Sequence, residues 1–200
     1  MRERIAGAGG DPERVAVVAV SKGRSLDDCR AALAAGLRML GENRVQEALP
    51  KLDALPEAEW HLVGHLQTNK VREAAGRFAL IHSVDSLHLA EALARRTPEQ
   101  PVLLQVNTSG EPQKHGFDPP AAVVAVVAVT QLLPVRGLMC MAAAEGDPRP
   151  AFEELRRLRD EAEQRLGRAL PVLSMGMTQD FEAAVRAGST MLRLGRVLFD

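Results

Sequence analysis

Lys22 is the side chain whose type and position most clearly suggest chemistry. It follows Ser21 at the end of an apolar run, residues 15–20, whose valines predict a buried strand. The chain holds only four lysines, at positions 22, 51, 70 and 114, among 25 basic residues. An amine that loses its proton on desolvation can form a Schiff base with an aldehyde. The alternative is an ordinary lysine that reaches from the strand end to water.

Two segments near the C-terminus have the composition of an anion site. Ser174, Gly176 and Thr178 precede a predicted helix, and Gly195-Arg196 opens another. The free N–H groups at the start of a helix attract anions, and glycine allows a ligand to approach the backbone closely. These segments therefore predict a phosphate site, with ordinary caps and turns as the alternative.

A lysine amine opposite a phosphate site suggests pyridoxal 5′-phosphate (PLP), which carries an aldehyde and a phosphate on one pyridine ring. Arg193 supports this interpretation, because strand alternation places it on the same face as Met191 and opposite Leu192 and Leu194. An inward arginine could reach the pyridine nitrogen, where a fixed cation disfavours protonation and makes the ring a poorer electron sink. An outward, solvated Arg193 is the alternative.

Eight short apolar runs alternate with segments of helical periodicity and must position these side chains. The expected strands are residues 15–20, 38–40, 61–63, 80–82, 102–106, 135–139, 172–173 and 191–194. Such repeated strand–helix units predict parallel strands joined by crossover helices, and eight of them predict an α/β fold with one closed (β/α)8 TIM barrel. Reactive groups of such barrels follow the C-terminal ends of the strands, and phosphate sites usually follow the last two.

Local signals predict how several helices begin. Ser25 with Asp28 resembles a capping box, and Thr178 is the expected cap of the helix that follows it. Residues 121–133 are rich in valine, which favours a strand, but they must bridge two expected strands. A buried helix is therefore expected there.

Composition argues against several classes of function. The formal net charge of −1 and the aromatic content of 3% provide neither a basic field nor stacking platforms for nucleic acid. The longest apolar stretch, residues 121–129, is too short to span a bilayer. Cys29 and Cys140 lack metal-type spacing, and His61 and His65 have no third ligand nearby in the sequence, so no metal site is predicted. We expect a cytoplasmic monomer with free thiols.

The motifs around these residues resemble the pyridoxal-phosphate homeostasis protein family (YggS/PROSC type). The resemblance extends from Val15 to Phe199. It rests on several long motifs in order: Val-Ser-Lys (20–22), Gly-Glu-Asn-Arg-Val-Gln-Glu (41–47), Trp-His-Leu-Val-Gly-His-Leu-Gln-Thr-Asn-Lys (60–70), Gln-Val-Asn-Thr-Ser-Gly-Glu-Pro-Gln-Lys-His-Gly-Phe (105–117), Arg-Gly-Leu-Met (136–139), Ser-Met-Gly-Met-Thr-Gln-Asp-Phe (174–181) and Leu-Arg-Leu-Gly-Arg (192–196).

This resemblance implies one PLP-binding barrel domain, residues 1–200, like the N-terminal domain of alanine racemase (PLP fold type III). It implies PLP held as a Schiff base on Lys22, with Arg193 near the ring nitrogen and Asn43 beside the ring. It also implies contacts with the phosphate from two segments of the chain: Ser174, Met175, Gly176 and Thr178 in the first, and Gly195 and Arg196 in the second. The sequence departs from the family pattern at Gly23-Arg24, where threonine and lysine are common, and in its short terminal helices.

Racemase chemistry requires a second acid/base opposite the lysine, which related racemases supply with a tyrosine from another domain. This chain has no Tyr. Together with Arg193, this absence predicts a PLP binder and carrier rather than an efficient enzyme, with no catalytic residue. The family resemblance implies the same, namely a role in PLP (vitamin B6) homeostasis with delivery of PLP to apo PLP-dependent enzymes. One alternative is a PLP-dependent amino-acid racemase or lyase with His65 or Cys140 as second base. Another is a protein-interaction scaffold without a cofactor.

Overall fold

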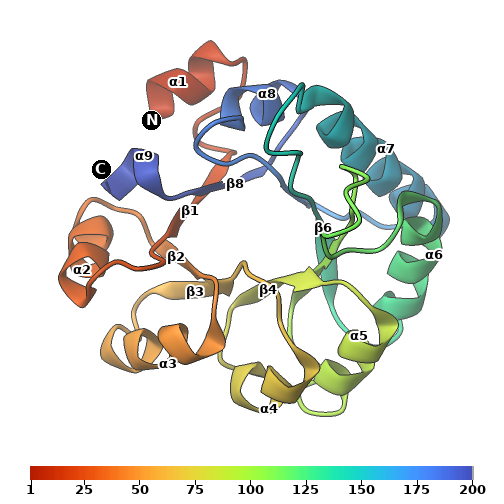
Figure 1. Cartoon of the computed structure of the whole chain (residues 1–200), viewed down its shortest axis with the longest axis horizontal. Helices are drawn as coiled ribbons and strands as arrows, with labels where there is room; N and C mark the ends of the chain where they lie inside the picture. The colour runs from red at the N-terminus through yellow and green to blue at the C-terminus, as the bar shows by residue number, and fades with distance from the viewer. Residues whose placement is uncertain (200) are drawn as a thin grey trace.

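Eight parallel strands form a closed barrel inside a ring of helices (Figure 1). The computed structural model describes residues 1–199. Neighbouring strands follow chain order, and β1 pairs with β8 to close the barrel. The predicted (β/α)8 fold is confirmed, and every expected strand is found within two residues of its predicted ends. The strands are β1 Ala16–Val20, β2 Met39–Glu42, β3 Glu59–Leu62, β4 Leu80–Val84, β5 Val102–Gln105, β6 Val135–Met139, β7 Val172–Ser174 and β8 Met191–Leu194.

Strand alternation separates two apolar layers. Val18, Leu103 and Met191 belong to a cluster that fills the inside of the barrel. Leu192 and Leu194 belong to the larger cluster between the strands and the helices. Successive side chains of a strand point to opposite faces, so each strand contributes to both layers. This alternation places Arg193 inside the barrel, as predicted.

The helices cover the outside of the strands. The capping box at the start of α2 is confirmed, because the Ser25 hydroxyl accepts the Asp28 N–H at 3.1 Å and the Asp28 carboxylate accepts the Ser25 N–H at 2.9 Å. The expected buried helix in residues 121–133 is also confirmed, as α6. The helices are α1 Arg2–Gly7, α2 Leu26–Ala34, α3 Val45–Ala54, the 3-10 turn η1 Thr68–Lys70, α4 Val71–Ala74, α5 Leu87–Ala94, α6 Pro119–Thr130, α7 Arg149–Leu166, α8 Phe181–Arg186 and α9 Arg196–Phe199.

The expected cap at Thr178 is wrong. Helix α8 begins at Phe181, its N-cap is Asp180, and no side chain caps it. The Asp180 carboxylate instead accepts the N–H of Met177 at 2.6 Å. The residues before α8 form a turn, so the helix begins two residues later than a helix capped by Thr178 would.

The short terminal helices do not prevent closure of the barrel. Ala16, Val17, Val18 and Ala19 of β1 each pair with a residue of β8. Helix α1 lies beside α8 (Figure 1), where Arg4 forms an ion pair with Glu182. No helix in residues 1–199 is long and apolar enough to cross a membrane.

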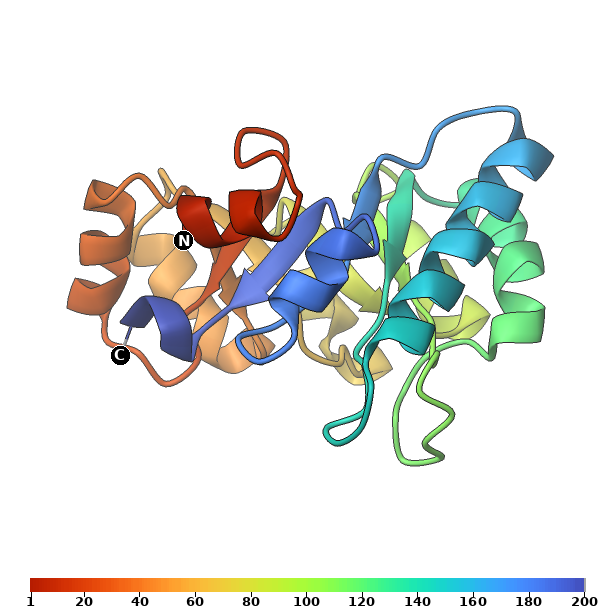
Figure 2. The same ribbon diagram turned by 90° about the horizontal axis from the view of Figure 1, so that it is seen from above.

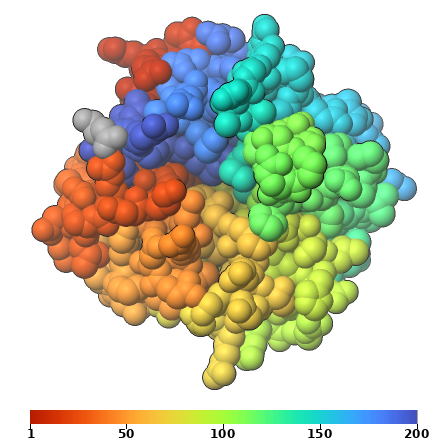
Figure 3. All heavy atoms as spheres, viewed as in Figure 1, coloured from red at the N-terminus to blue at the C-terminus, as the bar shows by residue number. Residues whose placement is uncertain are grey.

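The segments that follow the strands project from one end of the barrel. Two of them, the connection from β5 to α6 and that from β6 to α7, extend furthest (Figure 2). Figure 3 looks onto this end, where the β5–α6 connection (green) stands forward over the rim. The side chains predicted to carry chemistry lie near the C-terminal ends of strands or after them, so this end is where they should meet.

Candidate functional site

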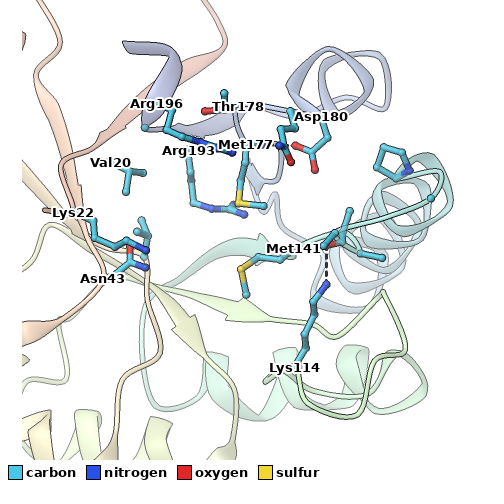
Figure 4. A pocket seen from close by; sticks show the side chains of 18 of the residues that line it. Val20, Lys22, Asn43, Lys114, Met141, Met177, Thr178, Asp180, Arg193 and Arg196 are labelled. Carbon is cyan, nitrogen blue, oxygen red and sulfur yellow. Dashed lines mark hydrogen bonds between the residues drawn. The ribbon is translucent and has the colours of Figure 1, made fainter. Parts of the chain in front are cut away.

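A cavity of about 560 Å³ opens at this end of the barrel. Its lining comes from the ends of several strands, and apolar side chains such as Val20, Val63 and Met141 line it beside polar ones. Six of the residues predicted for the site lie on this lining: Lys22, Asn43, Thr178, Arg193, Gly195 and Arg196. The barrel therefore brings together residues that follow β1, β2 and β7 and residues at the end of β8, which are far apart in the sequence (Figure 4).

Lys22 lies two residues beyond the end of β1, beside Asn43 in the cavity wall (Figure 4). Its side chain is exposed, as in the alternative of a lysine that reaches from the strand end to water. Lys51, Lys70 and Lys114 each form an ion pair, whereas Lys22 makes no hydrogen bond or ion pair with any residue in the described part of the chain. Its amine is thus available to a ligand in the cavity.

The Arg193 side chain reaches from β8 into the cavity (Figure 4). It is 5% exposed, and its guanidinium donates to the Ser174 hydroxyl at 2.7 Å and to the Cys140 carbonyl at 2.8 Å. Burial lowers the pKa of Arg193, although the shift starts from a high ordinary value and leaves the group a cation at neutral pH. Two anchored donors fix the direction of the guanidinium, which makes it a stationary positive charge at the base of the cavity.

A buried chain of polar side chains continues beneath Arg193. The Ser174 hydroxyl also contacts Nδ1 of His82 at 2.9 Å, and Nε2 of His82 is 2.9 Å from Nδ1 of His61. Burial, followed by the neighbouring His61 and Arg193, holds the pKa of His82 well below its usual value. His82 is therefore a neutral imidazole, and it supports Ser174 without adding a second charge below the cavity.

A buried ion pair lies behind Lys22. Lys51 Nζ is 2.6 Å from a Glu42 carboxylate oxygen and donates at 2.8 Å to the carbonyl of Ser21, the residue before Lys22. The Ser21 hydroxyl donates to the same Glu42 oxygen at 2.6 Å. Sequence reasoning missed this group. Its available signals were the rarity of lysine in the chain and the glutamate at the end of a strand.

The backbone of Asn43 passes very close to Gly64. A methyl group on Gly64 would lie 2.2 Å from the Asn43 carbonyl oxygen and 2.7 Å from its Cα atom. Only glycine fits at this distance without displacing the backbone that carries Asn43. The close approach explains why a glycine follows β3 at this point of the barrel.

Three residues predicted for the phosphate lie behind the cavity lining. The Ser174 hydroxyl is engaged with Arg193 and His82, as described above. Met175 is fully buried in the layer between strands and helices. Gly176 has φ of +97° and packs against Ala184 and Leu192. None of the three lines the cavity, and a contact with a phosphate through this segment stays a prediction.

The two candidate second bases are poorly placed for chemistry in this cavity. His65 lies outside the lining, in a separate hollow with Asp85 and His115. Cys140 is fully buried, and burial raises the pKa of its thiol to about 11. A thiol with that pKa is protonated at neutral pH and cannot accept a proton.

The fold and the lysine-bearing cavity define the class of alanine-racemase-like barrels. The family model for the alanine racemase N-terminal domain matches residues 3–200. The chain belongs to this family and, within it, to the pyridoxal phosphate homeostasis proteins, which confirms the resemblance seen in the motifs.

Relatives of known name match most of the chain. The pyridoxal phosphate homeostasis protein of Aquifex aeolicus is 44% identical over 176 residues, covering 82% of this chain and 77% of the relative. That of Pseudomonas aeruginosa is 41% identical over 210 residues, covering 100% of this chain and 90% of the relative.

Solved structures show the same barrel. PipY of Synechococcus elongatus, solved without PLP, has 39% identity and a TM-score of 0.89, with 99% of both chains covered. The PipY structure with PLP bound has 37% identity, a TM-score of 0.85 and the same coverage. Alanine racemase from Corynebacterium glutamicum shares the fold alone, with 18% identity and a TM-score of 0.77 over 58% of its own length.

Proposed function

We propose that this chain binds PLP in the cavity and holds it as a Schiff base on Lys22, acting in PLP homeostasis and carriage. The observation that carries the proposal is the pairing of an unbonded lysine amine with a buried, anchored arginine across one cavity. A volume of about 560 Å³ is ample for this cofactor and lies within the usual range for small-molecule sites. The relatives named for PLP homeostasis and the PLP-bound PipY structure support the same ligand.

The residues of the cavity suit the parts of the cofactor. When bound, PLP supplies an aldehyde for amine chemistry and a ring that can accept electrons. Arg193, a fixed cation in the lining, would disfavour a proton on the ring nitrogen, and Asn43, on the same lining, is our candidate for a contact with the ring. Thr178, Gly195 and Arg196 line the same cavity, and the first N–H groups of α9 have no partners within the helix. These groups are our candidates for the phosphate, together with the backbone of Ser174, Met175 and Gly176.

We infer a carrier rather than an efficient enzyme. Racemase-like proton transfer needs one base positioned on each face of the bound amino acid, and Lys22 can act as the base on one face only. The buried thiol of Cys140 and the separate position of His65 provide no second base in this cavity. We further propose apo PLP-dependent enzymes as recipients, a monomeric state and a cytoplasmic location, where the free thiols of Cys29 and Cys140 would stay reduced.

Borohydride trapping tests the binding mode. We expect the protein with PLP to show imine absorbance that borohydride removes, and peptide mapping to place the reduced adduct on Lys22. Lys22→Ala should lose the adduct completely. Lys70→Ala is the matched control, since Lys70 is partly exposed and pairs with Glu73 away from the cavity. An adduct that persists in Lys22→Ala would overturn the proposal.

Deuterium exchange separates a carrier from a racemase or lyase. The PLP-loaded protein would be incubated in deuterated water with single enantiomers of amino acids. We expect α-deuterium to enter much more slowly than in an alanine racemase measured alongside, because neither His65 nor Cys140 can act as the second base in this cavity. Exchange at a racemase-like rate would establish the enzyme instead.

A further inference from the structure

Three side chains that can bind metals meet at the rim of the barrel, outside the cofactor cavity. His65 follows β3, Asp85 follows β4, and His115 lies between β5 and α6. The Nδ1 atoms of His65 and His115 are 2.9 Å and 3.6 Å from the same Asp85 oxygen, Oδ2. Their imidazole rings are stacked, with centroids 3.8 Å apart and planes inclined by 8°. Within residues 1–199, this is the one group of three such side chains whose ligand atoms lie within 4.8 Å of one another.

The backbone that carries these side chains is fixed. The side chain of Gln105, itself 3% exposed, donates to the carbonyl of His115 at 2.7 Å. Asp85 directly precedes Ser86, which caps helix α5 by accepting a backbone N–H. The first histidine is followed by Leu66, which is 1% exposed and anchors its loop in the core. The cluster is therefore built on three adjacent, well-anchored connections.

We propose that His65, Asp85 and His115 form a binding site for one Zn²⁺ ion. Two imidazole nitrogens and one carboxylate oxygen are a donor set that suits Zn²⁺ and leaves a fourth position open. Water or the side chain of Gln67, which lines the same hollow, can fill that position. Oxygen-preferring ions such as Mg²⁺ are poorly served, because they favour carboxylate, carbonyl and water ligands.

The distances match a tetrahedral centre after a small movement. Zn²⁺ bonds of about 2.0–2.2 Å place neighbouring ligand atoms about 3.3 Å apart. The two nitrogen–oxygen distances, 2.9 Å and 3.6 Å, lie on either side of that value. An ion lies in the plane of each imidazole that binds it, so the parallel rings must turn apart. The His65 and His115 side chains are 36% and 57% exposed, which lets both rings turn without disturbing the core.

The lysine that borders this hollow does not oppose a cation there. Lys114 borders it, but its amine donates to the Ala142 carbonyl at 2.8 Å and pairs with Glu111. Lys114 also lines the cofactor cavity, so a Zn²⁺ ion on the adjacent His115 would restrain one wall of that cavity. The Zn²⁺ site itself needs no cofactor and stands independently of the PLP proposal.

Isothermal titration of the tag-free, PLP-loaded protein with Zn²⁺ tests the site. We expect one ion per chain near neutral pH, and no heat from Mg²⁺. Asp85→Asn and His115→Ala should each weaken Zn²⁺ binding by about 100-fold or more, because changing even the outer shell of a site costs 10–100-fold. His88→Ala is the matched control, because His88 is an exposed histidine outside the cluster. It should bind Zn²⁺ as the unmodified protein does.

Two further readouts keep the result interpretable. Zn²⁺ should raise the melting temperature of the unmodified protein and of His88→Ala but not of the two cluster variants, which separates site loss from misfolding. Affinity should fall on acidification, because the imidazoles must be deprotonated to bind. Absence of Zn²⁺ binding, or equal affinity in Asp85→Asn, His115→Ala and His88→Ala, would overturn the proposal.

Discussion

The end of strand β1 separates two regions that use lysine in opposite ways. Behind it, Lys51 is 12% exposed and bonded to Glu42 and to the carbonyl of Ser21. In front of it, Lys22 is exposed on the cavity wall and bonded to nothing in the described chain. A buried amine with two partners is a structural element, whereas an unbonded amine facing a cavity can react. The Lys51–Glu42 pair behind β1 therefore fixes the Ser21–Lys22 peptide, which carries the Lys22 amine in front of the strand.

Removing the buried lysine should have the largest effect on stability. Lys51→Met leaves the Glu42 carboxylate buried without its partner, and we expect a loss of about 3–5 kcal/mol in the free energy of unfolding, measured with urea. Glu42→Gln combined with Lys51→Met should recover a substantial part of it, since no buried charge remains. A loss below about 1 kcal/mol in the single variant would mean that water reaches Glu42 and that the region behind β1 is not closed.

Removing the buried arginine of the cavity should lower the free energy of unfolding by a smaller amount. Arg193→Met loses two hydrogen bonds of a charged donor and leaves the Cys140 carbonyl unpaired, and we expect a loss of about 2–3 kcal/mol. The bound PLP should then show a pH-dependent absorbance change that the unmodified protein lacks, because the ring nitrogen can accept a proton. An unchanged spectral titration would show that Arg193 does not contact that nitrogen.

Adding a methyl group at Gly64, between the ends of β2 and β3, tests whether PLP binding on the Lys22 side of β1 depends on the position of the Asn43 backbone. Gly64→Ala must displace Asn43, and overpacking of this kind costs about 1–3 kcal/mol. We also expect weaker PLP binding, measured by equilibrium titration. Gly7→Ala is the matched control, because no atom lies within 4 Å of the added carbon there. Unaltered PLP affinity in Gly64→Ala would remove Asn43 from the binding site.

The smallest effect is expected for alkylation of the two cysteines in the folded protein. Cys29 packs behind β1 and Cys140 lies beneath the cavity; both are fully buried, and burial raises the pKa of each thiol. With a pKa of about 11, about one Cys140 thiol in a thousand is ionised at about pH 8. We expect iodoacetamide to modify neither residue until the protein is unfolded, as followed by mass spectrometry. Rapid native modification of Cys140 would show that the cavity floor opens, and would favour the racemase or lyase.

The raised pKa of Cys140 also has a consequence for stability at high pH. The unfolded thiol ionises near its ordinary value of 9.0, whereas the folded thiol stays neutral up to about 11. The contribution of the buried thiol to folding is therefore complete below about pH 9 and lost as the pH rises towards 11. We expect Cys140→Ala to lose less of its free energy of unfolding over this interval than the unmodified protein does.

The sequence determined the eight strands, the order of strands and helices, and the inward direction of Arg193. These features depend on alternation over a few residues, which the backbone geometry of a strand dictates. The motifs from residue 20 to residue 196 also identified the family. Six of the nine residues predicted for the site line one cavity.

Only the tertiary structure decided which polar groups are partners. Three features were not visible in the sequence: the late start of α8, the pairing of Lys51 with Glu42, and the meeting of His65, Asp85 and His115. The physical reason is that periodicity is local, whereas a hydrogen-bond partner depends on how the closed barrel aligns the ends of its strands. That alignment places residues twenty or more positions apart within 3 Å of each other, as at Lys51 and the carbonyl of Ser21 (2.8 Å).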